Sequence, residues 1–145
     1  TYDLQPSMSA EGITDAVIAE LQRQEAAFVC LNFANPDMVG HTGVLPAIVE
    51  AVECTDRCAQ RVVEAARANG YACVIIADHG NADKAVNPDG TPNTAHTVNP
   101  VPVFVVADAA LQLRDGILAD VAPTLLQLMD MEKPAEMTGS SLIVR

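Results

Sequence analysis

The chain has three histidines, and each lies beside a small or acidic residue in a segment that we predict to be a loop. His41 ends an Asp-x-x-x-His pattern that begins at Asp37, shortly after a predicted strand. Asp78 and His79 directly follow a second predicted strand, and His96 lies in the polar loop after them. In an open α/β sheet, ligands bind just beyond the carboxyl ends of the parallel strands. We therefore expect these side chains to meet at one edge of the sheet, where they could bind metal ions.

The donor types also indicate which metals such a site would prefer. Carboxylate oxygen together with neutral imidazole suits Mn²⁺, Zn²⁺ or Fe²⁺, whereas Mg²⁺ and Ca²⁺ prefer oxygen ligands alone. Five candidate ligands are more than one four-coordinate ion requires, and two ions about 3.5–4 Å apart are typical of enzymes that transfer phosphoryl groups. The chain has a formal net charge of −11, so bound cations would also supply the positive charge that an anionic substrate needs. The pattern predicts a dinuclear metal site.

Each of these residues also has a structural explanation when it is taken alone. Asp37 could cap the turn after it, Asp78 could cap a helix after its strand, and a single loop histidine is usually only solvated. Two acid–histidine pairs at strand ends, with the third histidine in the next loop, favour the metal site over these explanations. The sequence has no phosphate-binding glycine motif and no serine close to a histidine, so we predict no catalytic nucleophile within this chain.

Hydrophobic periodicity predicts the helices and strands that would position these loops. The predicted helices cover residues 9–23, 46–69 and 117–129. The predicted strands cover residues 27–33, 72–77 and 101–107. The first two strands and the helix between them would form one right-handed βαβ crossover. The second strand is apolar without alternation, which is typical of a parallel strand that is covered on both faces. The predicted fold class is α/β.

Length and composition exclude several classes of protein. With 145 residues the chain has room for one domain, and its acidity argues against binding nucleic acid. No apolar run approaches the ~18 residues of a membrane span, and the first residues do not form a signal peptide. We expect Cys30, Cys54, Cys58 and Cys73 to be buried or half-buried reduced thiols, because their spacing does not match a zinc site. We therefore predict a soluble, cytoplasmic protein.

Three strings around the candidate ligands closely resemble signatures of the cofactor-independent phosphoglycerate mutases, a family of the alkaline phosphatase superfamily. They are NFANPDMVGHTG at 32–43, ADHGNA at 77–82 and TAHTVNPVP at 94–102. Segments 1–6, 122–126 and 134–139 also resemble the family, so the likeness covers essentially the whole chain. The Asp-x-x-x-His and Asp-His-Gly patterns occur across the superfamily, whereas the string at 32–43 is much more specific.

The resemblance implies a role for each candidate ligand. It assigns Asp37, His41 and His96 to one Mn²⁺, and Asp78 and His79 to a second Mn²⁺. The family interconverts 3-phosphoglycerate and 2-phosphoglycerate through a phosphoserine intermediate and needs no bisphosphoglycerate. We therefore expect phosphoglycerate as the small-molecule substrate of a glycolytic, monomeric parent enzyme, with neither nucleic acid nor a membrane as partner.

The resemblance also implies that residues 1–145 are the C-terminal part of a three-layer, alkaline-phosphatase-like domain. That domain has a mainly parallel sheet with helices on both faces. In the family, the nucleophilic serine and one further metal-binding aspartate come from a segment near the N-terminus of the full chain, and a separate transferase domain supplies arginines and an acid–base aspartate. We find none of these in this sequence. We therefore expect the chain alone to be inactive and to leave an exposed sheet edge.

Two alternatives remain open from the sequence. Another phosphomutase or a phosphohydrolase of the superfamily would share the acid–histidine pairs but not the long string at 32–43. A non-catalytic metal-binding module would hold its metal without an open coordination position.

Overall fold

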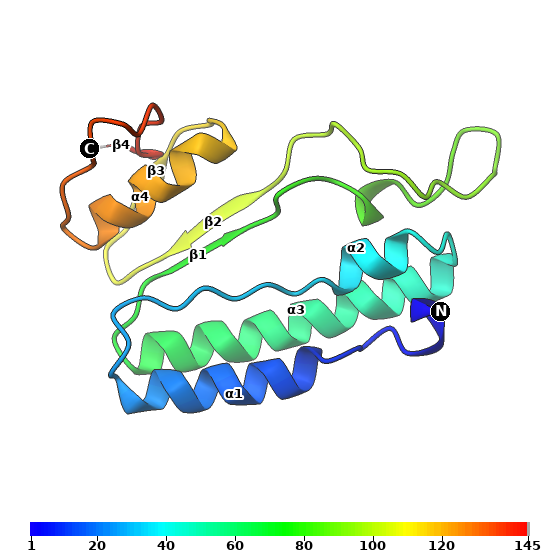
Figure 1. Cartoon of the computed structure of the whole chain (residues 1–145), viewed down its shortest axis with the longest axis horizontal. Coiled ribbons are helices and arrows are strands. Elements are labelled where there is room, and N and C mark those ends of the chain that lie inside the picture. The colour runs from blue at the N-terminus through cyan, green and yellow to red at the C-terminus, as the bar shows by residue number, and fades with distance from the viewer. Residues whose placement is uncertain (145) are drawn as a thin grey trace.

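The computed structural model describes residues 1–144, which form helices and short strands in mixed order (Figure 1). The α-helices are α1 (Ala10–Arg23), α2 (Asn35–Gly40), α3 (Leu45–Ala68) and α4 (Val121–Leu128). The strands are β1 (Cys73–Ile76), β2 (Val103–Val106), β3 (Gln112–Leu113) and β4 (Ile143–Val144). Short 3₁₀ helices cover Tyr2–Leu4, Ala82–Lys84 and Leu118–Asp120. The α/β class predicted from the sequence is confirmed.

The long helix α3 begins and ends where the sequence predicts, to within one residue. Pro46 lies in its first turn, where the missing N–H costs no helical hydrogen bond. At its C-terminus Gly70 adopts a φ of +80°, a conformation that is accessible to glycine without strain. The N–H of Gly70 donates to the carbonyl of Arg67, and the N–H of Tyr71 donates to that of Ala66 at 2.9 Å. This Schellman-type closure satisfies carbonyls that the end of the helix leaves free.

The hydrophobic core lies between α3 and the elements that pack on it. Val39 of α2 is fully buried and contacts Ala47, Ile48 and Ala51 of α3. A second group joins Ala10 of α1 to Cys54 and Cys58 of α3. Figure 1 shows α1 and α3 side by side, with α2 beside the N-terminal end of α3. The short helix α2, which contains Asp37 and is followed directly by His41, is therefore anchored to α3 by buried apolar contacts.

The predicted strands at 72–77 and 101–107 are confirmed as β1 and β2, but their relative direction differs from the parallel arrangement that we expected. They pair antiparallel, with Cys73 opposite Val106 and Ile76 opposite Val103. The physical reason is that a loop, rather than a crossover helix, joins them, so the chain turns back on itself. In Figure 1, α1 and α3 lie on one side of these strands and α4 lies on the other, in keeping with a layered α/β domain.

The predicted strand at 27–33 is wrong for the described residues, because this segment pairs with no other strand there. It runs as an irregular segment into α2 (Figure 1). Its apolar residues are consequently less covered than expected: Phe28 is 53% exposed, and Cys30 is exposed rather than buried. The other thiols agree with the prediction, since Cys54 and Cys58 are buried and Cys73 is half-buried.

The predicted helix at 117–129 is confirmed as a 3₁₀ turn that leads into α4, and its first residues anchor the C-terminal segment. Asp120 is buried, and its carboxylate accepts hydrogen bonds from the backbone N–H of Ser140 at 2.8 Å and of Ile117 at 3.1 Å. The guanidinium of Arg114 lies 3.3 Å from the same carboxylate. These backbone donors, followed by Arg114, hold the pKa of Asp120 below its ordinary value.

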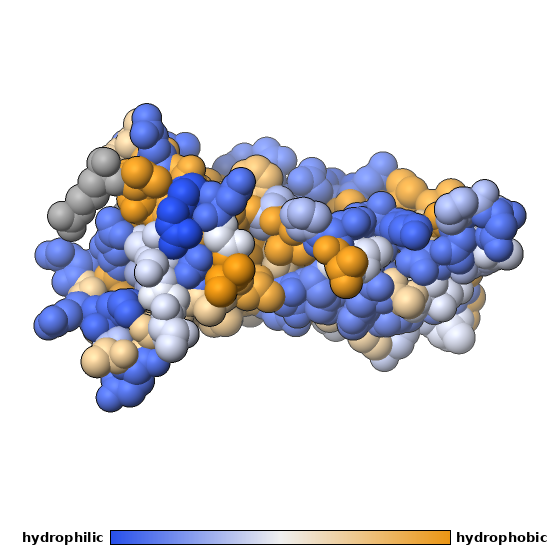
Figure 2. Space-filling view, turned by 90° about the horizontal axis from the view of Figure 1, so that it is seen from above, coloured by the Kyte–Doolittle hydropathy of each residue, from blue (hydrophilic) through white to orange (hydrophobic). Residues whose placement is uncertain are grey.

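Several large apolar side chains remain exposed in the sheet formed by β1 and β2 and just before α4. They include Ile76, Phe104, Ile117 and Leu118. Figure 2, which views the molecule from above, shows hydrophobic groups set among hydrophilic ones on this face. Among the described residues β1 and β2 each have one edge without a partner strand, and self-association through such an edge stays a prediction.

No helix in residues 1–144 combines the length and the apolar character needed to cross a membrane.

Candidate metal centre

The first two candidate ligands are positioned by α2. Asn35 and Pro36 begin this helix, Asp37 lies in its first turn, and His41 is the C-cap residue directly after it. Because the two residues are four positions apart and His41 keeps a helical conformation, their side chains share one face. Oδ1 of Asp37 lies 3.2 Å from Nε2 of His41. Both side chains are about one-third to two-fifths exposed, at 32% and 42%. An ion could therefore reach them from solvent while the backbone beneath them stays buried.

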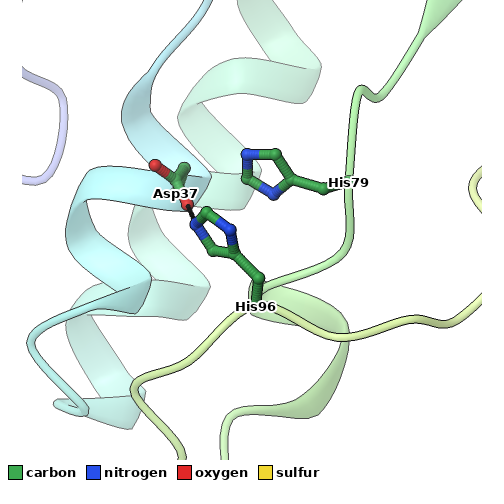
Figure 3. Close-up of side chains that lie close together, drawn as sticks. All are labelled: Asp37, His79 and His96. Atoms are coloured by element: carbon green, nitrogen blue, oxygen red, sulfur yellow. Dashed lines mark ion pairs between the residues drawn. The ribbon is translucent and has the colours of Figure 1, made fainter.

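His79 and His96 come from the two arms of the long segment between β1 and β2. The arms are joined by an antiparallel bridge between Gly80 and Thr97, in which the N–H of Thr97 donates to the carbonyl of Gly80 at 2.8 Å. The bridge stacks the two imidazole rings, with centroids 3.8 Å apart and an interplanar angle of 18°. Figure 3 shows both rings directed toward Asp37 on α2. The bridge between Gly80 and Thr97 thus positions His79 and His96 next to Asp37 of α2.

The potential metal-donor atoms of Asp37, His41 and His96 lie close together. Nε2 of His96 lies 3.0 Å from Oδ1 of Asp37 and 3.2 Å from Nε2 of His41. Donor atoms held about 2.0–2.2 Å from one ion lie about 3.0–3.5 Å apart when they occupy adjacent coordination positions. The three distances among Asp37, His41 and His96 therefore match the spacing of three ligands around a single divalent ion.

His79 and Asp78 extend the group. One donor atom each from Asp37, His79 and His96 lie within 4.8 Å of one another. Asp78 is less closely integrated, because its side chain is 80% exposed and its Oδ1 lies 3.6 Å from Nε2 of His79. The structure thus brings four of the five predicted ligands together. Asp78 lies at the edge of this group, and of the other four ligands only His79 is close to it.

One orienting contact around the donors was not predicted. Nδ1 of His41 lies 2.8 Å from the backbone carbonyl oxygen of Thr94. A carbonyl can only accept, so this contact favours the tautomer with hydrogen on Nδ1 and leaves the Nε2 lone pair free for a metal ion. A backbone acceptor has no signature in the sequence, so spacing alone could not have identified it.

Asp83 is a second unpredicted residue, and it fixes the loop that carries His96. Its carboxylate accepts hydrogen bonds from Nδ2 of Asn99 at 2.6 Å and from Oγ1 of Thr97 at 3.0 and 3.2 Å. The hydrogen bond from Asn99, followed by that from Thr97, lowers the pKa of Asp83. Asp83 therefore ties the arm after His79 to the arm after His96 while it stays ionised at neutral pH.

Comparisons with known proteins agree with this geometry. A model of the Metalloenzyme superfamily matches residues 1–133. Proteins named 2,3-bisphosphoglycerate-independent phosphoglycerate mutase from Flavobacterium johnsoniae and Bacteroides fragilis are both 54% identical to this chain, over 143 and 144 residues. These matches cover 99% of this chain but only 28% and 29% of those proteins. The resemblance to this mutase family is confirmed, and the chain spans less than a third of the length of these relatives.

A solved structure shows the same likeness in three dimensions. The crystal structure of Leishmania mexicana phosphoglycerate mutase at low cobalt concentration matches with a TM-score of 0.89 and 32% identity. The match covers 99% of this chain and 29% of that one. Because the family model matches most of the chain, and because carboxylate and imidazole donors converge in the structure, the chain belongs to the metalloenzyme superfamily.

Proposed function

We propose that these residues are the metal-binding, C-terminal part of the phosphatase-like domain of a cofactor-independent phosphoglycerate mutase. The complete enzyme would interconvert 3-phosphoglycerate and 2-phosphoglycerate through a phosphoserine intermediate, without bisphosphoglycerate. The observation that carries this proposal is the convergence of Asp37, His41 and His96 at mutual distances of 3.0–3.2 Å. It occurs in a chain that is similar over nearly its whole length to mutases of that name.

The five ligands would be divided between two divalent ions. We assign Asp37, His41 and His96 to one ion, and Asp78 and His79 to the other. The buried Nδ1 of His79 has no hydrogen-bond partner among the described residues, so none of their polar groups fixes the tautomer of this ring. We propose Mn²⁺ as the metal, since mixed carboxylate and imidazole donors suit it better than Mg²⁺ or Ca²⁺.

The metal ions, when bound, would supply positive charge to activate the serine and to spread the charge of the transferring phosphoryl group. The chain's own residues prepare that site. Thr94 orients His41, Asp83 fixes the loop of His96, and α3 supports α2 from below. A chain of net charge −11 repels a phosphorylated acid until cations neutralise its carboxylates. The nucleophilic serine would come from a segment outside these residues.

The proposed setting follows from the same assignment. Phosphoglycerate mutases of this kind would act in glycolysis, in the cytoplasm, and we propose that the complete enzyme works as a monomer. Buried thiols at Cys54 and Cys58 suit a reducing compartment.

Phosphorus NMR tests this proposal on the full-length protein that carries these residues. The protein is loaded with Mn²⁺ and given 3-phosphoglycerate without any bisphosphoglycerate. We expect the resonance of 2-phosphoglycerate to appear, and to be absent after chelation of the metal. Inorganic phosphate alone would instead indicate a phosphohydrolase of the superfamily, and no reaction would favour a non-catalytic metal-binding module. Residues 1–145 alone should give no 2-phosphoglycerate, because the nucleophile is supplied from elsewhere.

A further inference from the structure

We propose that Asn81 is a positioning residue that fixes the Asp37 carboxylate for metal binding; this inference rests on the metal site proposed above. Nδ2 of Asn81 donates a hydrogen bond to Oδ1 of Asp37 at 2.8 Å. It also lies 3.4 Å from the Asp37 carbonyl oxygen and 3.5 Å from Nε2 of His41. The oxygen that Asn81 contacts is the same one that faces His41 and His96. Asn81 therefore acts on the atom where the three donors meet.

The ordinary structural role of an asparagine at this position does not apply. Asn81 immediately precedes the 3₁₀ turn Ala82–Lys84, where asparagine often caps a helix, but its side chain makes no capping hydrogen bond. The residue is only 5% exposed, and its Oδ1 is buried without a hydrogen-bond partner among residues 1–144. A buried, unpaired acceptor destabilises the fold, and an apolar residue would fill the space without that cost. The amide group is thus explained by what its NH₂ donates.

The orientation of the amide is determined by its neighbour. A carboxylate can only accept, so the NH₂ group, and not Oδ1, must face Asp37. The hydrogen bond from Asn81 occupies one lone pair of Asp37 Oδ1 and restricts rotation of the carboxylate about χ2, the Cβ–Cγ bond. Contacts of this kind with ligand side chains are common around protein metal sites and affect metal affinity strongly.

Gly40 provides the space that this contact requires. A Cβ atom at Gly40 would lie 2.1 Å from Oδ1 and 2.8 Å from Cγ of Asn81, far inside van der Waals contact. Gly40 belongs to α2 and is not among the glycines with positive φ, so its backbone conformation does not call for glycine. The absent side chain is needed for the close approach of Asn81. Two residues from separate segments are therefore matched to place one amide against Asp37.

The test compares Asn81→Leu with Asn35→Leu in the full-length protein, using Mn²⁺ and Co²⁺ as probes. Leucine branches at the same carbon as asparagine but donates no hydrogen bond. Asn35 is a matched control, because it is 3% exposed and its Nδ2 donates to the carbonyl oxygens of Pro6 and Ser7 rather than to a ligand. Calorimetric titration gives the Mn²⁺ affinity, and visible absorption reports the coordination geometry of bound Co²⁺.

We expect Asn81→Leu to weaken Mn²⁺ binding about 10–100-fold and to shift the Co²⁺ absorption bands. Asn35→Leu should lower thermal stability while it leaves the affinity and the bands of the wild type. Asn81→Ala, which adds no bulk, provides the same test if the leucine variant does not fold, and Gly40→Ala should weaken Mn²⁺ binding in the same direction.

The failure of this inference is distinguishable from failure of the proposed function. If the wild-type protein binds neither ion, the metal site itself is wrong. If the wild type binds both ions and the Asn81 variants match it in affinity and absorption, the role of Asn81 is overturned. Equal losses of affinity in the Asn81 and Asn35 variants would also overturn it, because they would show that general loosening of the fold is sufficient.

Discussion

The carbonyl oxygen of Thr94 lies 2.8 Å from Nδ1 of His41, across 53 positions of the sequence. This contact joins the loop of His96 to the helix of Asp37, and it directs Nε2 of His41 toward the other donors. The site is therefore assembled by backbone and side-chain contacts between distant segments before any ion is considered. Its parts should respond differently to substitution, according to whether they donate to metal or only support the fold.

Substitution of His96 by alanine should weaken Mn²⁺ binding by at least about 100-fold, more than loss of a residue that only orients a ligand. Nε2 of His96, a potential metal donor, lies 3.0 Å from Oδ1 of Asp37. A Mn²⁺ titration of the full-length protein measures the effect. Thr91→Ala is the matched control, because Thr91 lies in the same polar loop and its hydroxyl contacts Asp89 and Asn87 only among the described residues. An unchanged titration in His96→Ala would refute His96 as a ligand.

Substitution of Ile48 by alanine should destabilise the protein by about 2–5 kcal/mol, because it opens a cavity where α3 packs on Val39 of α2. Its neighbour on α3, Val49, is 48% exposed. Val49→Ala should therefore change the stability by no more than about 0.5 kcal/mol. Denaturant unfolding followed by circular dichroism gives both values. Similar losses in the two variants would contradict the assigned core.

Substitution of Asp120 by asparagine should make the stability less dependent on acid pH. The pKa of Asp120 is lowered from its ordinary 3.8 in the folded protein by donors from Ser140 and Ile117. A carboxyl group with a depressed folded pKa contributes stability above its unfolded pKa and loses it as the pH falls through the folded value. We expect Asp120→Asn to lower the midpoint of thermal unfolding at neutral pH, with a difference from wild type that narrows below pH 3.8.

The control for this measurement is Asp56→Asn, at an exposed position of α3. It should keep both the stability and the acid dependence of the wild type. A difference between Asp120→Asn and wild type that stays constant from neutral to acid pH would show that the carboxylate charge is not involved.

The thiols should differ in their reactivity toward a disulfide reagent such as DTNB. Burial raises the pKa of Cys54 and of Cys73, and Cys54 and Cys58 are both covered by the core. Cys30 is exposed. We expect one fast thiol in the native protein, which Cys30→Ser removes, and release of Cys54 and Cys58 only on unfolding. Fast modification of Cys54 would place the α1–α3 contact in doubt.

The sequence predicts the helices well because their signals are local. The apolar spacing of α1 and α3, Pro46 at the start of α3 and Gly70 after its end all act within a few residues. The apolar composition of segment 27–33 predicts a strand, but a strand also requires a partner strand, and composition contains no information on that partner. The antiparallel pairing of β1 with β2 depends on how the loop between them folds, which hydrophobic periodicity does not describe.

The candidate site divides in the same way. Two acid–histidine pairs and one loop histidine in the sequence point to Asp37, His41, His79 and His96, which the structure brings together, and to Asp78, which lies beside His79. The strand expected before Asp37 does not form among the described residues, so for Asp37 and His41 the residue types and their spacing were the useful signal. The contacts that orient these ligands were not identified. Thr94 acts through its backbone, and Asn81 acts through a side chain whose burial depends on the missing Cβ of a glycine far from it in sequence. Such contacts follow from the tertiary structure rather than from any local pattern.

The most direct test of the metal assignment is anomalous X-ray scattering from a crystal of the full-length protein loaded with Mn²⁺. We predict two anomalous peaks. One should lie about 2.0–2.2 Å from donor atoms of Asp37, His41 and His96, and the other at a similar distance from Asp78 and His79. A single peak, or peaks away from these five residues, would contradict the dinuclear site.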